Sequence, residues 1–228
     1  MAEKKNVQNL NEEVVIAKAK DFWSRYGKLT TVISVVVILL AGGWYVYQSY
    51  FKKPKETKAA GILFKAEEYF RADSVSKALN GDGQHWGFLR VIDKYGGTKA
   101  GNMACFYAGS CYIKLNENEK ALKYLKKFSS SSKPVQASAY KLMADAYADL
   151  GKNKDAFEYY EKAARHFEKD ETFSADCLLM AAYLAQKNLN DTKKATKLYQ
   201  ELKQKYPRSQ QSMDADKYLA QMGVYSTE

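Results

Sequence analysis

The feature that most constrains the chain is an uncharged stretch near its N-terminus. It extends from Leu29 to Phe51 and has the sequence LTTVISVVVILLAGGWYVYQSYF. A helix over these residues, rising 1.5 Å per residue, spans roughly 35 Å and crosses a hydrocarbon core of about 30 Å. No other part of the chain is comparably apolar. We therefore predict one transmembrane helix over residues 29–51, and not a buried core helix.

Aromatic and small residues add detail to this prediction. Aromatic rings before the stretch and near its end suit the two lipid–water interfaces. The predicted anchor residues of this kind are Trp23, Tyr26, Trp44 and Tyr47. Gly42 and Gly43 permit close approach of another membrane helix; glycines that face lipid are the alternative.

A cleaved signal peptide is the alternative to a retained anchor. Its apolar part is usually about 7–15 residues long and is followed by a small-x-small cleavage site. The stretch here is longer, and an aromatic cluster follows it without such a site, which favours a retained anchor. Lys and Arg flank both ends in similar numbers, so charge does not fix the orientation.

The flanking residues are predicted to form a tail and a linker. Asn11, followed by two glutamates, is typical of a helix start. Within the tail, residues 1–28, we expect a short amphipathic helix on the membrane surface. Its apolar stripe would comprise Val14, Val15, Ala17, Phe22 and Trp23. A simple extension of the transmembrane helix is an equal alternative. Residues 52–58 are expected to link the anchor to a domain at 59–228.

The distribution of charge bears on the partners. The formal net charge is +10, and half of the excess lies in the two segments that flank the apolar stretch. Lipid head groups would lie at these positions. The remaining excess is spread over a long segment and gives only a weak field. We therefore expect contact with a membrane and no binding of nucleic acid.

The second half of the chain repeats a helical pattern. Ala121 in NEKALKYL, Ala156 in NKDAFEYY and Ala195 in TKKATKLY begin corresponding helices at intervals of 35 and 39 residues. The units start near Asn102, Ala137 and Phe173. Small residues suit close helix crossings, and Gly151 suits a turn between helices. The longer second interval is expected to place extra residues in the turn 188–191.

This pattern resembles the tetratricopeptide repeat (TPR) family over residues 102–208, which implies stacked helix pairs. A helix over 59–72 and a partner over 85–95, joined across the loop 80–83, would form an aberrant first unit. A helix over 210–222 would cap the stack. The predicted fold class is therefore all-α: a single N-terminal transmembrane helix followed by a TPR-type α-solenoid of three to four helix pairs with a C-terminal capping helix.

The resemblance also implies a partner-binding surface, because TPR proteins bind partners mainly through their first helices. These positions are Met103, Phe106, Ser110 and Ile113, then Ser138, Lys141, Asp145 and Ala148, and then Ser174, Cys177, Ala181 and Leu184. For Met103 and Phe106, a role in the core is an equal alternative. Only Lys141 fits the basic clamp with which some members hold chaperone C-termini. We therefore expect a helical or extended segment with apolar side chains instead.

No motif indicates catalysis. The sequence has no P-loop, HExxH or GxSxG motif. His85 and His166 do not belong to a cluster with metal-ligand spacing. The three cysteines, Cys105, Cys111 and Cys177, fall within helical patterns and are expected to be buried thiols. We expect no enzyme activity, metal, cofactor or small-molecule substrate.

A closer resemblance concerns the layout of the chain. The segment AKDFWSRYGKLTTVISVVVILLAGGWYVYQSY, joined through KKPKETKAA to the repeats, is similar to the YfgM family of ancillary subunits of the bacterial SecYEG translocon. The resemblance implies a single-pass inner-membrane protein with a cytoplasmic N-terminus and periplasmic repeats. Its partners would be translocon subunits, a periplasmic chaperone or exported clients. An adaptor in cell-wall or outer-membrane assembly and a cytosol-facing TPR regulator are the alternatives.

Overall fold

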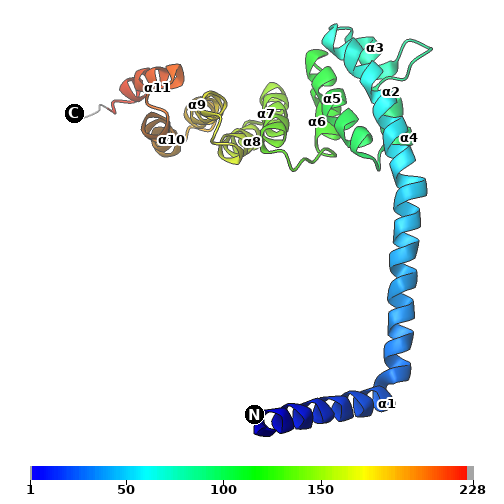
Figure 1. The fold of residues 1–228 in the computed structure, drawn as a ribbon. Helices are drawn as coiled ribbons and strands as arrows, with labels where there is room; N and C mark the ends of the chain where they lie inside the picture. Colours follow the sequence, from blue (N-terminus) through cyan, green and yellow to red (C-terminus); the bar gives the residue numbers. More distant parts are fainter. Residues whose placement is uncertain (1, 225–228) are drawn as a thin grey trace. The chain divides into compact units, whose positions relative to one another are not determined.

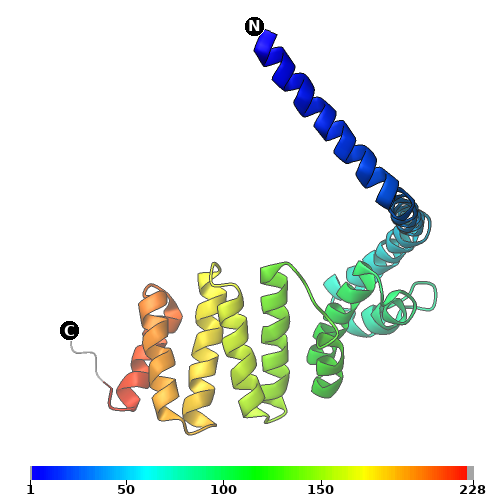
Figure 2. The same ribbon diagram turned by 90° about the horizontal axis from the view of Figure 1, so that it is seen from below.

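The computed structural model describes the backbone of residues 2–224 and the side chains of residues 16–18 and 20–224. Helices make up all the regular structure of these residues, apart from one antiparallel bridge between Gly81 and Trp86 (Figures 1 and 2). This confirms the predicted all-α class. The chain divides into two compact units, Met1–Lys55 and Glu56–Glu228, which we call the N-terminal unit and the repeat unit and describe separately.

The N-terminal unit is helical from its first described residue. α1 runs without a break over Ala2–Val46 and leads into η1, Tyr47–Lys52. The helix start expected at Asn11 is therefore wrong. The side chains of Val14 and Val15, two members of the proposed apolar stripe, lie outside the described residues. The exposed fractions of Phe22 and Trp23 are 53% and 64%.

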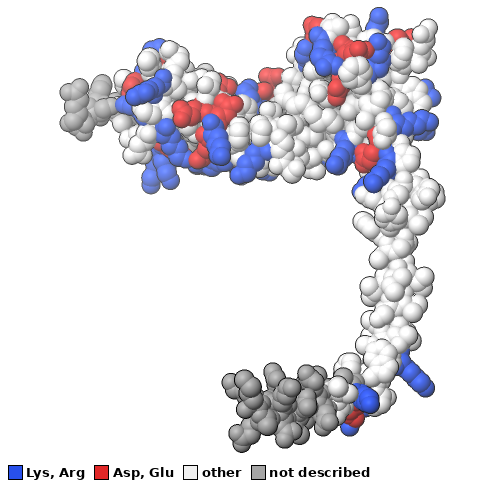
Figure 3. All heavy atoms as spheres, viewed as in Figure 1, with Lys and Arg blue, Asp and Glu red and all other residues white. Residues whose placement is uncertain are grey.

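The apolar stretch within α1 is exposed along its whole length. Leu39 and Leu40 are each 68% exposed, and no residue of the most apolar window is buried. Figure 3 shows this part of the helix as a column without charged side chains. In water such a surface is strongly unfavourable, so the alternative of a core helix is wrong. Near the N-terminus the chain thus has one helix that is long and apolar enough to cross a membrane, a test that a signal sequence also meets.

Between α1 and α2, Lys53–Arg71, the hydrogen bonding of the helix changes from α-type to π-type. η1 is a π-type turn, and after it the backbone N–H of Lys53 donates to the carbonyl of Gln48. Pro54 has no N–H to donate, and its ring would collide with the carbonyl four residues earlier. A local π-type turn accommodates such a residue within a continuous helix. Residues 52–58, which we expected to act as a linker, are therefore helical.

The repeat unit contains three helical hairpins followed by a single helix. The hairpins are α5 (Lys99–Lys114) with α6 (Asn118–Leu125), α7 (Lys133–Asp149) with α8 (Asn153–His166), and α9 (Glu171–Lys187) with α10 (Thr192–Lys205). Successive helices pack side by side, as Figure 2 shows. The predicted TPR-type solenoid is confirmed.

Close helix crossings explain the repeated small residues. Ala121, Ala156 and Ala195 are each fully buried. In the first hairpin, a Cβ placed on Gly109 would lie 2.5 Å from Cγ of Leu125, so α5 and α6 approach closely only because residue 109 has no side chain. Each hairpin turn also contains one residue in the left-handed region, Asn116, Gly151 or Asn190. The role expected of Gly151 is therefore confirmed.

The first, irregular unit differs from the sequence prediction. A short helix that we did not predict, α3 (Val75–Asn80), follows α2, and α4 spans Phe88–Tyr95 and so begins later than expected. The chain before α4 is extended, with a bridge between Gly81 and Trp86 and an extended backbone at Gly87. Only glycine fits at residue 87, because a Cβ there would lie 2.3 Å from the carbonyl oxygen of Leu79. Phe70 of α2 packs against Phe88 and Tyr107, with ring centroids 6.3 and 5.3 Å apart, which joins this unit to α5.

The register of the third unit also differs from the prediction. Five buried residues of α7 recur 38 positions later in α9: Ala139, Met143, Ala144, Ala146 and Tyr147 correspond to Cys177, Ala181, Ala182, Leu184 and Ala185. The unit start predicted at Phe173 implied a shift of only 36. The turn 188–191 is one residue longer than the turn 150–152. That turn follows α9, so it lengthens only the interval between the second helices, to 39 residues. The start of α9 is displaced because α8 has 14 residues whereas α6 has 8, and the shorter connection 167–170, compared with 126–132, offsets part of this difference.

α11 (Gln210–Gln221) closes the C-terminal end of the stack, as predicted. The ring of Tyr218 stacks on Tyr199 of α10 with a centroid distance of 5.3 Å. Lys203 of α10 forms an ion pair with Asp216 of α11. A polar outer face on the last helix is what a solenoid needs to stop its own growth.

Candidate protein-interaction surface

One face of the first helices remains partly exposed after the hairpins have stacked. On α5 this face carries Met103, Phe106, Ser110 and Ile113, and on α7 it carries Ser138, Lys141, Asp145 and Ala148. Within each set the residues are three or four positions apart, which places them on one side of a helix. Every member of both sets is partly accessible to solvent.

The positions predicted for α9 require a correction. Cys177 and Ala181 have no exposed surface and Leu184 is 5% exposed, so these residues belong to the core. Ser174 is also buried, and its hydroxyl donates to the carbonyls of Ala164 and Phe167. The shift of 38 residues places Asp176, Leu179, Tyr183 and Gln186 at the positions equivalent to Ser138, Lys141, Asp145 and Ala148. All four are partly or largely exposed.

Contacts between successive hairpins join these faces into one continuous surface. Met103 and Phe106 of α5 pack against the cluster that contains Ala139 of α7. Between α7 and α9, Nζ of Lys141 lies 4.0 Å from the carboxylate of Asp176. We call the twelve positions on α5, α7 and α9 the first-helix surface.

The centre of the first-helix surface is charged. Nζ of Lys141 lies 3.3 Å from both carboxylate oxygens of Asp145. The hydroxyl of Tyr160, on α8, donates to Asp145 over 2.6 Å. Burial raises the pKa of Tyr160, and this hydrogen bond raises it further, so the phenol stays protonated and keeps its role as a donor.

The two ends of the surface are apolar. Met103, Phe106 and Ile113 lie at the α5 end, where the ring of Phe106 packs against Phe128 with centroids 5.2 Å apart. At the α9 end, Leu179 lies beside Tyr183, whose ring meets Tyr218 edge to face at 5.8 Å. Met103, Phe106, Ile113 and Leu179 pack against the core on one side and meet solvent on the other. Met103 and Phe106 therefore contribute to the core and also keep exposed surface.

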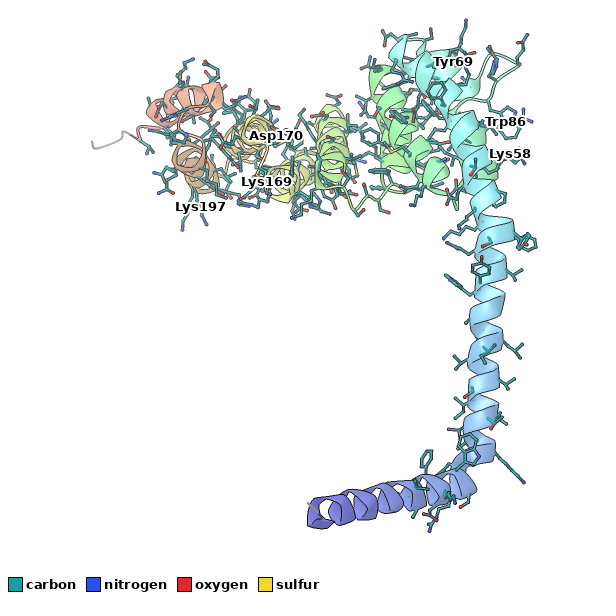
Figure 4. The ribbon with its side chains drawn as sticks, in the orientation of Figure 1. Lys58, Tyr69, Trp86, Lys169, Asp170 and Lys197 are labelled. Carbon is teal, nitrogen blue, oxygen red and sulfur yellow. The ribbon has the colours of Figure 1, made fainter. Side chains whose placement is uncertain are left out.

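The opposite side of the stack carries an ion-pair network between the second helices. Arg165 of α8 donates two hydrogen bonds to Glu201 of α10, over 2.8 and 3.1 Å, and a third to Glu161. The guanidinium lowers the pKa of Glu201. A cavity of about 320 Å³ lies beside this network, with Lys193 and Lys197 on its wall. Lys197 is labelled on the outside of α10 in Figure 4.

The connection between α3 and α4 is built around one carboxylate. Asp82 accepts hydrogen bonds from the backbone N–H groups of Gln84 and His85 and from the hydroxyl of Tyr69. These bonds, led by that of Tyr69, lower the pKa of Asp82 well below its ordinary value. A cavity of about 250 Å³ lies between this connection and α2, with Trp86 on its wall. Tyr69 and Trp86 are labelled in Figure 4.

The three cysteines are poorly suited to nucleophilic chemistry. Cys105, Cys111 and Cys177 are buried free thiols, and burial raises the pKa of both Cys111 and Cys177 to about 12. A thiol with so high a pKa is almost wholly protonated near neutral pH and is a poor nucleophile. Among the described side chains, no three His, Cys, Asp or Glu residues gather as metal ligands.

The predicted anchor residues of the N-terminal unit are accessible. Trp23, Tyr26, Trp44 and Tyr47 are between 50% and 66% exposed. A Cβ built on Gly42 or Gly43 would meet no other atom within 4 Å, so the backbone at this point of α1 is open to a neighbour.

Comparison with known protein families identifies the repeats. A model described as a tetratricopeptide repeat-like domain matches residues 20–139, and a tetratricopeptide repeat model matches residues 176–209. The chain belongs to the tetratricopeptide repeat-like family. No curated protein matches the chain significantly. TPR domains generally serve as protein-interaction modules without enzymatic activity, which agrees with the exposed first-helix surface and the unreactive thiols of this TPR protein.

Sequence reasoning missed two parts of this TPR domain. It did not foresee α3, because a helix of six residues is too short to show a full amphipathic pattern. It also missed Asp176, Leu179, Tyr183 and Gln186. The signal that identifies them is the recurrence of small residues, since Ala175 and Ala182 repeat Ala137 and Ala144 at an interval of 38 residues, and all four are buried.

Proposed function

We propose that this TPR protein is a membrane-anchored scaffold that binds other proteins through its first-helix surface. The observation that carries the proposal is the pair of apolar patches on that surface, Met103, Phe106 and Ile113 at one end and Leu179 with Tyr183 at the other. Exposed apolar patches rimmed by polar residues mark protein-interaction sites. An amphipathic helix or an extended segment of a partner would cover them.

The apolar part of α1 supports membrane anchorage. No residue of its most apolar window is buried by the rest of the described residues, and a bilayer would bury these side chains at little cost. The family match begins at residue 20 and runs through this stretch into α7, so the stretch and the first repeats occur together in the family model. We propose a retained single-pass anchor over residues 29–51, with a domain over 59–228.

We further propose that the protein works beside the SecYEG translocon in the bacterial inner membrane, like the YfgM family that it resembles. In this arrangement the N-terminus is cytoplasmic and the repeats are periplasmic. The partners are translocon subunits together with a periplasmic chaperone or exported clients. Gly42 and Gly43 would allow another membrane helix to pack closely against α1.

Labelling of a single introduced cysteine tests the orientation. Lys123→Cys places an exposed thiol on α6, whereas the native thiols are buried and protonated. In intact spheroplasts a membrane-impermeant maleimide should label Lys123→Cys and leave the parent protein unlabelled. Labelling only after the membrane is permeabilised would show that the repeats face the cytosol. A mature chain that lacks residues 1–51 on mass spectrometry would instead identify a cleaved signal sequence.

Site-specific photocrosslinking tests the interaction surface. A photoreactive residue at Phe106 or Leu179 should crosslink translocon subunits or exported proteins in living cells. The matched control is the same residue at Lys197, on the outside of α10, which should give few crosslinks. Equal crosslinking from the two sides would refute the surface assignment. Crosslinks only to cell-wall or outer-membrane assembly factors would refute the translocon and favour the envelope-assembly alternative.

A further inference from the structure

The centre of the first-helix surface has an imbalance of charge. Its only charged members are Lys141, Asp145 and Asp176, so two carboxylates face one ammonium. The excess is negative although the whole chain carries +10. The sign of this patch is therefore a local feature of the surface and does not follow from the composition.

The two carboxylates differ in how fully they are engaged. Asp145 receives the hydroxyl of Tyr160 at 2.6 Å and the ammonium of Lys141 at 3.3 Å, and its side chain is 28% exposed. Asp176 meets the same ammonium only at 4.0 Å, beyond hydrogen-bond distance, and its side chain is 44% exposed. Asp176 is therefore less fully engaged than Asp145, and its carboxylate is accessible to a partner.

Apolar side chains flank this carboxylate on the same surface. Leu179 and Tyr183 follow Asp176 on α9 at helical spacings of three and seven residues, and the patch of Met103 and Phe106 lies across α7. A cation brought to Asp176 by a partner would lie beside Leu179 and Tyr183. Apolar side chains of the partner that cover these two residues would exclude water and strengthen the ion pair.

We propose that the first-helix surface selects partner segments in which a basic residue, arginine above all, lies between apolar side chains. The guanidinium would form a bidentate pair with Asp176, and the apolar side chains would cover the patches at either end. An acidic segment would be repelled by Asp145 and Asp176 together. This inference rests on the proposed function, because it names the chemistry of the partner at that same surface.

A random peptide library displayed on phage tests the inference. The full chain in nanodiscs of zwitterionic lipid is the bait, and empty nanodiscs remove peptides that bind lipid. Selected peptides should be enriched in Arg or Lys between Leu, Met or Phe. Asp176→Lys should reverse the preference and enrich Asp or Glu. Peptides enriched without any bias in charge would overturn the inference and leave the proposed function standing. A library without any binder would count against both.

A binding measurement on one selected peptide makes the test quantitative. Asp176→Asn should weaken binding about tenfold, as expected for the loss of one charge-assisted pair. The matched control is Asp93→Asn, an exposed aspartate of α4 outside the first-helix surface, which should leave the affinity unchanged. If both variants weaken binding equally, the effect is one of overall charge and the proposed role of Asp176 is wrong. Circular dichroism should show unchanged helix content in both variants.

Discussion

Gly109 sets the distance between α5 and α6, and Gly109→Ala tests whether that closeness matters. A Cβ at this position would lie 2.5 Å from Cγ and 2.7 Å from Cδ2 of Leu125. Leu125 has no exposed surface, so its side chain has little room to move aside. The added methyl group therefore meets a fixed neighbour.

Two opposing effects determine the size of the change. Alanine is favoured over glycine within a helix by about 1 kcal/mol. Forcing an extra carbon into a packed core costs about 1–3 kcal/mol. We therefore expect Gly109→Ala to lower the free energy of unfolding by up to about 2 kcal/mol, because the larger effect opposes the propensity gain.

The sign should reverse once the obstructing side chain has been removed. Leu125→Ala alone should cost about 2–5 kcal/mol. In that background Gly109→Ala no longer meets Leu125, and it should stabilise by about 1 kcal/mol. Urea denaturation of the four proteins in detergent, followed by far-UV circular dichroism, gives the double-mutant cycle.

Gly61→Ala is the matched control, because Gly61 lies within α2 and a Cβ there meets nothing within 4 Å. This variant should gain about 1 kcal/mol from helix propensity alone. If Gly109→Ala behaved like Gly61→Ala, or if its effect were the same with and without Leu125, the close crossing of α5 and α6 would not explain the glycine.

Variants at three further positions test other features. Gly151→Val should cost about 1–2 kcal/mol in urea denaturation because Gly151 has φ of 68°, whereas Gly151→Asn should cost clearly less. Ser174→Ala should cost about 1–2 kcal/mol in the same assay, since it removes the donor to two carbonyls, those of Ala164 and Phe167. Glu201→Gln tests pH dependence. Arg165 lowers the pKa of Glu201 below 4.5, so the pair stabilises above that value and is lost as the pH falls through the folded-state pKa. The difference in Tm between parent and variant should therefore shrink in acid, and a constant difference would refute the pairing.

The register of α9 shows where sequence reasoning reached its limit. Alignment on Ala156 and Ala195 gave the correct interval for the second helices. It could not show how many of the extra residues lie before α9 and how many lie in the turn after it. The reason is that no strong stop signal marks the end of α8 at His166. An error of two residues on a helix rotates a side chain by about 200°, which explains why Cys177, Ala181 and Leu184 lie in the core.

The sequence by itself determined the helical class, the long apolar helix near the N-terminus, the three hairpins and the cap, because each depends on local pattern and on spacing that repeats. It also placed α5 and α7 in the correct register, so their exposed faces were predicted. Tertiary structure decided the rest. Only stacking shows which side of α9 is covered, that Pro54 is absorbed by a π-type turn, and that Lys141 is shared by two carboxylates from different repeats. Such contacts depend on distances between helices, and no single helix encodes them.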